Sequence, residues 1–125
     1  MDPAPVAAAP APPAEVARLR ELLRQHRFDE VLSVAAALLA TDPWQREALL
    51  CSAIAQRFLG HIPEALKLLA TLEQHHPRFS RLYEERGRCF VALRQAPAAI
   101  ESFLRAVHIN HALPGSWQML EGLYR

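Results

Sequence analysis

Histidine and cysteine are the residue types in this chain that could bind a metal ion or act as nucleophiles. His75 and His76 are adjacent, so on a helix their side chains point about 100° apart and make a poor chelate. His108 and His111 are three residues apart and could share a face, but a predicted helix end lies between them. No cysteine or carboxylate joins either pair at a ligand spacing. We therefore expect no metal site and no cofactor.

The two cysteines indicate structure rather than catalysis. Cys51 and Cys89 lie inside apolar helical patterns and form no CxxC motif. Buried, reduced thiols are therefore expected. The sequence suggests no Ser/His/Asp or Cys/His set and no paired buried carboxylates. Its four glycines form no phosphate-binding loop. The prediction is that this chain is not an enzyme.

Charge and hydropathy restrict the partners. Fourteen basic and 13 acidic side chains leave a formal charge of +1, so no basic face for nucleic acid or an anionic membrane is expected. The longest apolar run, residues 34–40, is too short to span a bilayer. The N-terminus has Asp2 and prolines where a signal peptide has a basic segment. A soluble, cytoplasmic protein is expected.

The composition and the positions of the prolines indicate which secondary-structure elements the chain forms. Hydrophobic residues make up 51% of the chain and aromatic residues 7%, so the apolar mass is Ala and Leu, which favour helices. Residues 1–13 read MDPAPVAAAPAPP, which predicts a disordered or polyproline-like tail. The remaining residues, 14–125, are predicted to form one all-α domain.

A 34-residue period organises this domain. Pro43 and Pro77 are separated by one such period, and each follows a helical run. The same spacing separates Phe28 from Ile62, Ile62 from Ala96, Pro63 from Pro97, and Ala65 from Ala99. A period of this length is the sequence signature of a repeat architecture in which each unit is one supersecondary element.

Each unit divides into two helices. Pro63 and Pro97 suit the first turn of a second helix, where a missing amide costs nothing, and Asp29 could cap the equivalent helix. Gly60 suits the left-handed residue that closes a first helix. The predicted helices span residues 14–25, 29–40, 46–59, 63–75, 80–93, 97–109 and 115–125.

These residues resemble the tetratricopeptide repeat (TPR) family. The third unit carries Tyr83, Gly87, Phe90, Ala99, Phe103 and Ala106 at the family's positions, the fourth Trp117, Leu120 and Tyr124, and the second Leu49, Ala53, Ala65, Leu69, Leu72 and Pro77. Ser52 and Gln56 depart from the pattern. The resemblance implies a right-handed α-solenoid of about three and a half repeats, at residues 14–45, 46–79, 80–113 and 114–125.

The spacing of small and polar residues has a physical reason. Ala53 with Ala65, and Gly87 with Ala99, would let the two helices of a pair touch closely. A lone helix pair cannot bury its apolar face, so stacked neighbours must provide the core. Helix 14–25 carries polar residues where large apolar ones are expected, which is typical of a terminal cap.

The resemblance implies that the chain binds a protein or peptide segment on the concave face made by the first helices. The candidate residues are Arg20, Leu23, Arg24, Leu50, Ile54, Arg57, Phe58, Arg81, Glu84, Arg88 and Val91. Five arginines around an apolar strip would suit a carboxylate-bearing peptide. In the alternative, these arginines are solvated and paired with Glu21, Glu47 and Glu85. The family's clamp for chaperone tails is not expected, because its positions hold Val16, Arg20, Cys51, Arg81 and Glu85.

The last predicted helix presents an apolar face without a partner helix: Trp117, Met119, Leu120, Leu123 and Tyr124. This face could contact a downstream domain or form a homodimer. Residues 99–107 and 109–117 also resemble the repeat region of bacterial TPR-containing sulfotransferases, which would make the chain the recognition arm of such an enzyme. Binding module, recognition arm and dimerising scaffold are therefore three open hypotheses.

Overall fold

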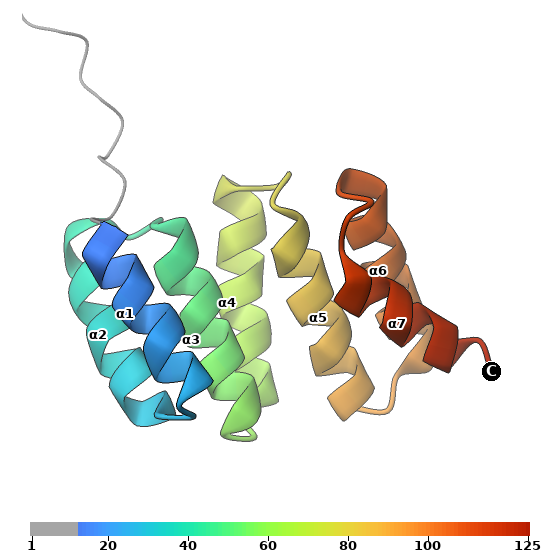
Figure 1. Ribbon diagram of the computed structural model, residues 1–125, viewed down its shortest axis with the longest axis horizontal. Helices are drawn as coiled ribbons and strands as arrows, with labels where there is room; N and C mark the ends of the chain where they lie inside the picture. Colours follow the sequence, from blue (N-terminus) through green and yellow to red (C-terminus); the bar gives the residue numbers. More distant parts are fainter. Residues whose placement is uncertain (1–12) are drawn as a thin grey trace, which may run out of the picture.

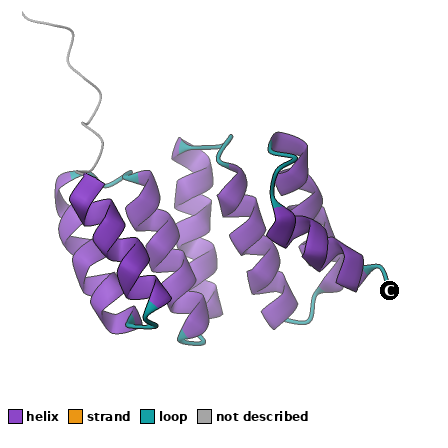
Figure 2. Cartoon of the chain, viewed as in Figure 1, coloured by secondary structure: helices purple, strands orange, loops and turns teal. Residues whose placement is uncertain are grey.

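The computed structural model describes residues 13–125, which form seven helices joined by short loops (Figure 2). Their bounds are α1 (Pro13–Arg24), α2 (Phe28–Thr41), α3 (Arg46–Phe58), α4 (Ile62–His75), α5 (Ser80–Ala92), α6 (Ala96–Ile109) and α7 (Pro114–Leu123). The helix bounds predicted from the sequence are correct to within two residues. The predicted tail, residues 1–13, lies outside the described residues except for Pro13, which begins α1.

The helices form two layers of a solenoid. In Figure 1 the odd-numbered helices α1, α3, α5 and α7 lie nearer the viewer, and α2, α4 and α6 lie behind them. Each even helix packs against the odd helices before and after it, and α3 also contacts α1 and α5. The odd helices α1, α3 and α5 therefore form a continuous wall. This wall has one face that packs on α2, α4 and α6 and one face that points away from them. We call the second face the inner wall.

A proline lies in the first turn of α4, of α6 and of α7. At these positions, which Pro63, Pro97 and Pro114 occupy, the amide has no partner within the helix. The expected cap at Asp29 is wrong. Because α2 already begins at Phe28, Asp29 lies in its first turn, where its charge suits the positive end of the helix dipole.

Three left-handed residues close the odd helices, at the same point of each repeat. Gly60 has a φ of 84°, as expected from the sequence. His26 and Arg94, which lie one repeat before and one repeat after Gly60, both have a φ of 58°. The sequence did not predict these two positions, because residues other than glycine adopt a positive φ uncommonly. The repeat therefore requires a left-handed turn whichever residue occupies it.

The core consists of three apolar clusters along the solenoid. The first joins α1, α2 and α3 around Leu19 and Val31. The second joins α3, α4 and α5 around Leu50 and Leu69. The third joins α5, α6 and α7 around Phe103, with Phe90 and Val91 of α5 packed against it. Each cluster draws on a helix pair and its neighbour, so the stacking of repeats provides the buried surface, as expected for a solenoid.

Gly87 allows the closest contact between α5 and α6. A Cβ atom at this position would lie 2.6 Å from Cζ of Phe103. Gly87 therefore packs against the ring of Phe103. The sequence had named Ala99, which lies one helical turn before Phe103 on α6, as its partner.

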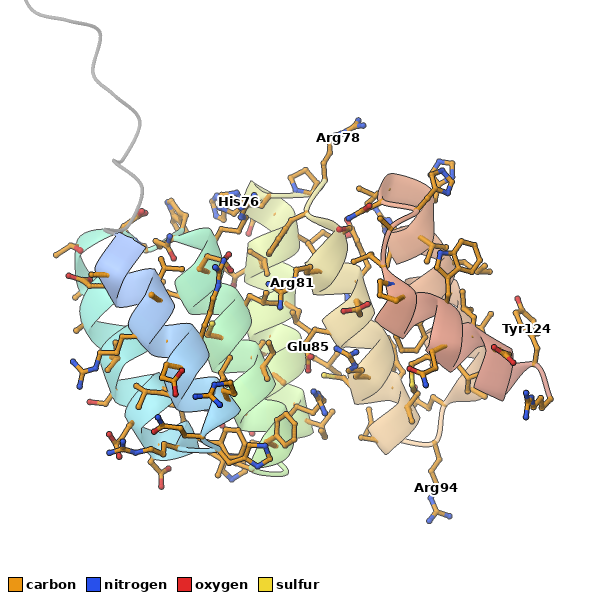
Figure 3. The ribbon with its side chains drawn as sticks, viewed as in Figure 1. His76, Arg78, Arg81, Glu85, Arg94 and Tyr124 are labelled. Carbon is orange, nitrogen blue, oxygen red and sulfur yellow. The ribbon has the colours of Figure 1, made fainter. Side chains whose placement is uncertain are left out.

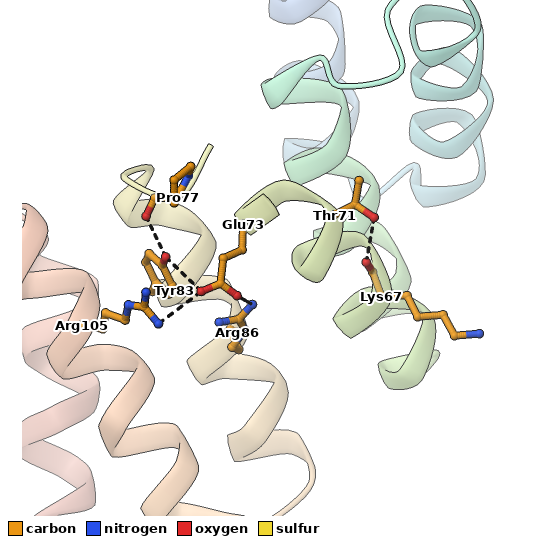
Figure 4. A network of polar contacts seen from close by, with 7 residues as sticks. All are labelled: Lys67, Thr71, Glu73, Pro77, Tyr83, Arg86 and Arg105. Carbon is orange, nitrogen blue, oxygen red and sulfur yellow. Dashed lines mark hydrogen bonds and ion pairs between the residues drawn. The ribbon is translucent and has the colours of Figure 1, made fainter. Parts of the chain in front are cut away.

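A polar network joins α4 to α5 and α6 (Figure 4). The Glu73 carboxylate accepts a hydrogen bond of 2.8 Å from Arg86 and pairs with Arg105 at 3.2 Å. The Tyr83 hydroxyl donates to the carbonyl of Pro77 at 2.7 Å, and the Arg105 guanidinium lies 4.4 Å above the Tyr83 ring. The hydrogen bond from Arg86 is the main reason that the pKa of Glu73 lies below its usual value.

Candidate functional site

Polar links between successive odd helices organise the inner wall. Arg20 of α1 pairs with Glu47 of α3, with 2.5 Å between Nη2 and Oε1. Arg57 of α3 binds both carboxylate oxygens of Glu85 on α5, and its Nη2 lies 3.2 Å from Oε1. These contacts hold α1, α3 and α5 side by side.

The link from α5 to α7 uses a hydroxyl group. Ser116 Oγ donates to Oε2 of Glu84 across 2.6 Å. Gly115 makes room for this contact, because a Cβ atom there would lie 3.0 Å from the Arg88 guanidinium and 3.3 Å from Glu84 Oε2. Arg88 in turn pairs with Glu84 at 3.4 Å.

Glu85 is the most deeply buried carboxylate of the wall, with 2% of its side chain exposed. Burial raises its pKa above the usual value, and the hydrogen bond and charge of Arg57 oppose this rise. A buried carboxylate without such a partner would be strongly destabilising. Arg57 is therefore required by the fold, whether or not it also meets a ligand.

The candidate arginines of the inner wall are mostly paired within the chain. Arg20 and Arg57 bind Glu47 and Glu85, and Arg24 binds Glu21 on its own helix. These three glutamates are the partners named in the alternative hypothesis of the sequence analysis, in which the arginines are solvated and paired. Arg81 is exposed and forms no ion pair with another residue of the described chain. Figure 3 shows it one turn before Glu85 on α5.

The apolar candidates divide between the core and the surface. Leu50 is only 1% exposed and belongs to the core, so its placement on the binding face is corrected. Its neighbours in sequence cannot reveal this, because its burial depends on α4 and α5. Leu23, Ile54 and Val91 are partly exposed on the wall, and Phe58 is 49% exposed.

Phe58 belongs to an aromatic cluster at the turns of the first two repeats. Its ring stacks on Phe28 with 4.8 Å between centroids, and His26 contacts both rings. The Arg57 guanidinium lies 4.5 Å above the Phe58 ring. Sequence reasoning named Phe58 but missed this cluster, because its members come from three different segments.

Cys51 lies on the face of α3 between α1 and α5. It is 2% exposed, and burial raises the pKa of its thiol to about 11. The charge of Glu47 adds to this rise, while the charges of Arg81 and Arg20 oppose it. At neutral pH the thiol is therefore protonated and a poor nucleophile. The expected burial of Cys51 is confirmed, and Cys89 is likewise buried; neither takes part in a disulfide within residues 13–125.

Glu47 was named from the sequence only as a partner of the wall arginines, and its second carboxylate oxygen was missed. It is 8% exposed, and its Oε2 atom is buried without a hydrogen-bond partner among residues 13–125. The signal in the sequence was its position, one helical turn before Cys51 and one repeat before Arg81.

The predicted C-terminal patch is divided. Leu120 is 3% exposed and packs with Phe103 in the third core cluster, so it is not part of a surface. Met119 and Leu123 are partly buried against the same cluster. Trp117 is 48% and Tyr124 65% exposed, and Figure 3 shows Tyr124 at the end of the molecule.

Trp117 also borders a shallow groove of about 540 Å³ on α6. The other residues that line it are Leu104, Arg105, Val107, His108 and His111. The indole Nε1 donates to the carbonyl of His111 at 2.8 Å. The structure therefore brings His108 and His111 together beside an aromatic ring.

In the described part of the chain, no three His, Cys, Asp or Glu side chains lie together as a metal site would require. The His75 ring stacks on Trp44 with 3.8 Å between centroids, and His76 Nε2 lies 2.7 Å from the Trp44 carbonyl oxygen. These two histidines therefore stabilise a junction between repeats. None of the helices in residues 13–125 is both long and apolar enough to cross a bilayer.

Comparison with known proteins establishes the fold. No family model matches the sequence, and no curated protein matches it. The structure is similar to the TPR domain of Sgt2 from Aspergillus fumigatus, with a TM-score of 0.83, 16% identity, and 98% of this chain and 83% of that chain covered. It is also similar to the first TPR of Spaghetti (RPAP3) bound to the HSP90 peptide SRMEEVD, with a TM-score of 0.78, 15% identity, and coverage of 89% and 88%.

A third similar structure is PcrH in complex with the chaperone-binding region of PopD. Its TM-score is 0.75 at 18% identity, with 89% of each chain covered. Sequence identities this low establish the architecture of the helices and leave the ligand of this chain to be argued from its own residues.

Proposed function

We propose that this chain, which has the tetratricopeptide repeat fold, is a binding module that holds an extended peptide segment of a partner protein on its inner wall. The observation that carries this proposal is the wall itself. Ion pairs hold α1, α3 and α5 side by side, and partly exposed apolar side chains on all three helices lie among polar ones. An extended peptide could cross all three helices and place alternate side chains on the apolar positions.

The similar structures support this proposal. RPAP3 and PcrH have the same arrangement of helices and were solved with peptide segments of partner proteins bound. A preformed wall costs little ordering free energy when a peptide binds.

The charges of the wall favour an uncharged, apolar segment over an acidic one. Arg20, Arg24, Arg57 and Arg88 are paired with four glutamates of the chain. A ligand carboxylate at any of these four arginines would compete with a glutamate of the chain, and at Arg57 it would leave Glu85 buried and unpaired. Among the wall arginines of residues 13–125, Arg81 is the one without such a competitor. The carboxylate-bearing peptide expected from the sequence is therefore our second choice of ligand.

Selection of peptides from a display library against the full chain tests the proposal. We expect 12-residue peptides rich in apolar side chains, with a Kd that Ile54→Ala or Arg81→Ala raises about tenfold, or about 1.4 kcal/mol. Lys67→Ala on α4 is the matched control, since Lys67 is exposed on the opposite layer. Failure to select any peptide would refute the peptide-binding function, and peptides sensitive only to Lys67→Ala would place the site elsewhere.

A further inference from the structure

Glu47 lies in the first turn of α3, the middle helix of the inner wall, and only one of its two carboxylate oxygens has a partner among residues 13–125. Oε1 is 2.5 Å from Arg20 Nη2, whereas Oε2 is buried and has no partner among residues 13–125. More than nine-tenths of the residue is buried. Buried acceptors are nearly always hydrogen-bonded in native proteins, and leaving one unpaired costs free energy. The position therefore needs a hydrogen-bond donor.

Arg81 lies on the next odd helix, α5. It occupies on α5 the position that Glu47 occupies on α3, one repeat earlier. The two helices are in contact, and packed helix axes are about 8–10 Å apart, a distance that an arginine side chain can span. The charges of Glu47, Arg20 and Arg81 also affect the pKa of the Cys51 thiol, which lies one helical turn after Glu47 on α3.

These charges determine which group fits. A ligand ammonium or guanidinium would meet the two arginines, and a ligand carboxylate would meet Glu47. A neutral group that offers both an N–H donor and a C=O acceptor satisfies the carboxylate and the exposed guanidinium together.

We propose that this point is a subsite for one residue of an extended peptide backbone, whose N–H donates to Glu47 Oε2 and whose C=O accepts from the Arg81 guanidinium. This inference rests on the proposed peptide-binding function and specifies how the peptide is held. In an extended chain the N–H and C=O of one residue project to the same side, so two neighbouring protein groups can meet both. Because this contact uses backbone atoms, it fixes the position of the peptide and does not select a side chain at that residue.

An N-methyl scan of a selected peptide tests the subsite. Each backbone amide is methylated in turn, and the Kd is measured by calorimetry for the wild-type chain and for Glu47→Met. We expect one amide whose methylation weakens binding about tenfold to the wild type and less than twofold to Glu47→Met, which is the coupling expected of a direct contact. Arg81→Met should also weaken binding of the unmethylated peptide.

Two further variants keep the test sharp. Glu64→Met is the matched control, because Glu64 is exposed on α4 in the outer layer. Arg20 is 59% exposed, so loss of its partner leaves no buried lone charge. If Glu47→Met does not fold by circular dichroism, Glu47→Gln replaces it, with a smaller coupling of the same sign.

The outcomes separate this inference from the proposed function. A peptide that binds with equal methylation effects in the wild type and Glu47→Met overturns the subsite and leaves the binding function intact. Coupling of Glu47 to a peptide Asn or Gln side chain, and to no backbone amide, would overturn the backbone contact. If no peptide is selected, both proposals fail.

Discussion

Arg94 closes the turn after α5 in the left-handed region, with a φ of 58°. Figure 3 shows its side chain extending away from the molecule. A residue with a Cβ atom pays about 1–2 kcal/mol for this conformation, whereas glycine adopts it without strain. The equivalent residue one repeat earlier is Gly60, so the same left-handed turn is formed by glycine in one repeat and by arginine in the next.

The prediction at this position is that Arg94→Gly stabilises the fold. After subtraction of the larger unfolded-state entropy of glycine, the expected gain in the free energy of unfolding is about 0.5–1 kcal/mol. Thermal denaturation followed by circular dichroism measures it. Arg78→Gly is the control, because Arg78 is also exposed in a turn but does not have a positive φ. Equal effects of the two substitutions would contradict the argument.

Arg57 provides the second prediction at the residue scale. Arg57→Met leaves Glu85 buried without its partner, which should lower the free energy of unfolding by about 3 kcal/mol at pH 7. Burial raises the pKa of Glu85 in the folded chain, so the native state retains its proton to higher pH than the unfolded state. The penalty is therefore smallest below the ordinary pKa of 4.5 and grows as the pH rises above it.

Urea denaturation at pH 4.5 and pH 7 checks this expectation. The double variant Arg57→Met/Glu85→Gln should recover most of the lost stability at pH 7, since it removes the buried charge. A penalty that is independent of pH would show that Arg57 acts through packing alone.

Gly87 shows how one residue sets the distance between two helices. In Gly87→Ala the new methyl group would meet the Phe103 ring at 2.6 Å. Phe103 is fully buried and cannot move freely, so we expect a loss of about 1–3 kcal/mol in the free energy of unfolding.

Gly122→Ala is the matched control for this prediction. It also lies in a helix, but its Cβ atom would meet nothing within 4 Å, so the substitution should be neutral or slightly stabilising. Guanidinium denaturation of both variants gives the comparison. If Gly87→Ala is as stable as Gly122→Ala, close contact with Phe103 does not limit the packing of α5 on α6.

The Glu73 network adds a pH dependence to the contact between α4 and α5. The pKa of Glu73 is lowered in the folded chain, chiefly by the hydrogen bond from Arg86. Its contribution is therefore present above the unfolded pKa and lost as the pH falls through the lower folded pKa. Glu73→Gln should cost about 1 kcal/mol at pH 7.

The difference between wild type and Glu73→Gln should shrink as the pH falls below 4.5, the usual pKa of a glutamate. Urea denaturation across this range measures it. Glu101→Gln on α6 is the control, since Glu101 is exposed and lines a surface groove together with Tyr83, Arg86 and Arg105. A constant difference at all pH values would contradict the role assigned to the carboxylate.

At the scale of the whole molecule, α7 exposes its aromatic residues at one end of the solenoid. Glu121 occupies the position held by Gly87 one repeat earlier, and it is exposed. Because Glu121 has a side chain where Gly87 has none, a helix packed on this face of α7 could not come as close as α6 comes to α5. The hypothesis of a symmetric dimer through this end predicts a mass of twice 14.0 kDa at high concentration.

Sedimentation analysis tests that hypothesis. The double variant Trp117→Glu/Tyr124→Glu should return the mass to 14.0 kDa, because Trp117 of α7 and Tyr124, which directly follows α7, are both exposed aromatic residues at this end. Wild-type protein that stays at 14.0 kDa at high concentration would refute the dimer. The resemblance to the repeat region of sulfotransferases stays a prediction, which the native protein's mass would test.

The sequence by itself determined the repeat length, the seven helices, their approximate bounds and the family resemblance. These features depend on signals within one repeat: prolines in first turns, small residues at close contacts, and apolar residues at helical spacing. These signals recur one period later, as Pro63 does at Pro97 and Ala65 at Ala99, so more than one repeat supports the same interpretation. The physical reason is that helix formation and pairing within a repeat depend on residues near one another in the chain.

The tertiary structure alone decided the character of the inner wall. It showed that Leu50 and Leu120 are buried, that Arg57 binds Glu85, and that one oxygen of Glu47 has no partner among residues 13–125. The residues that Arg20 and Arg57 bind lie 27 and 28 positions away in sequence. Which charges meet depends on how far neighbouring repeats shift against each other and on side-chain rotamers, neither of which a repeat pattern specifies.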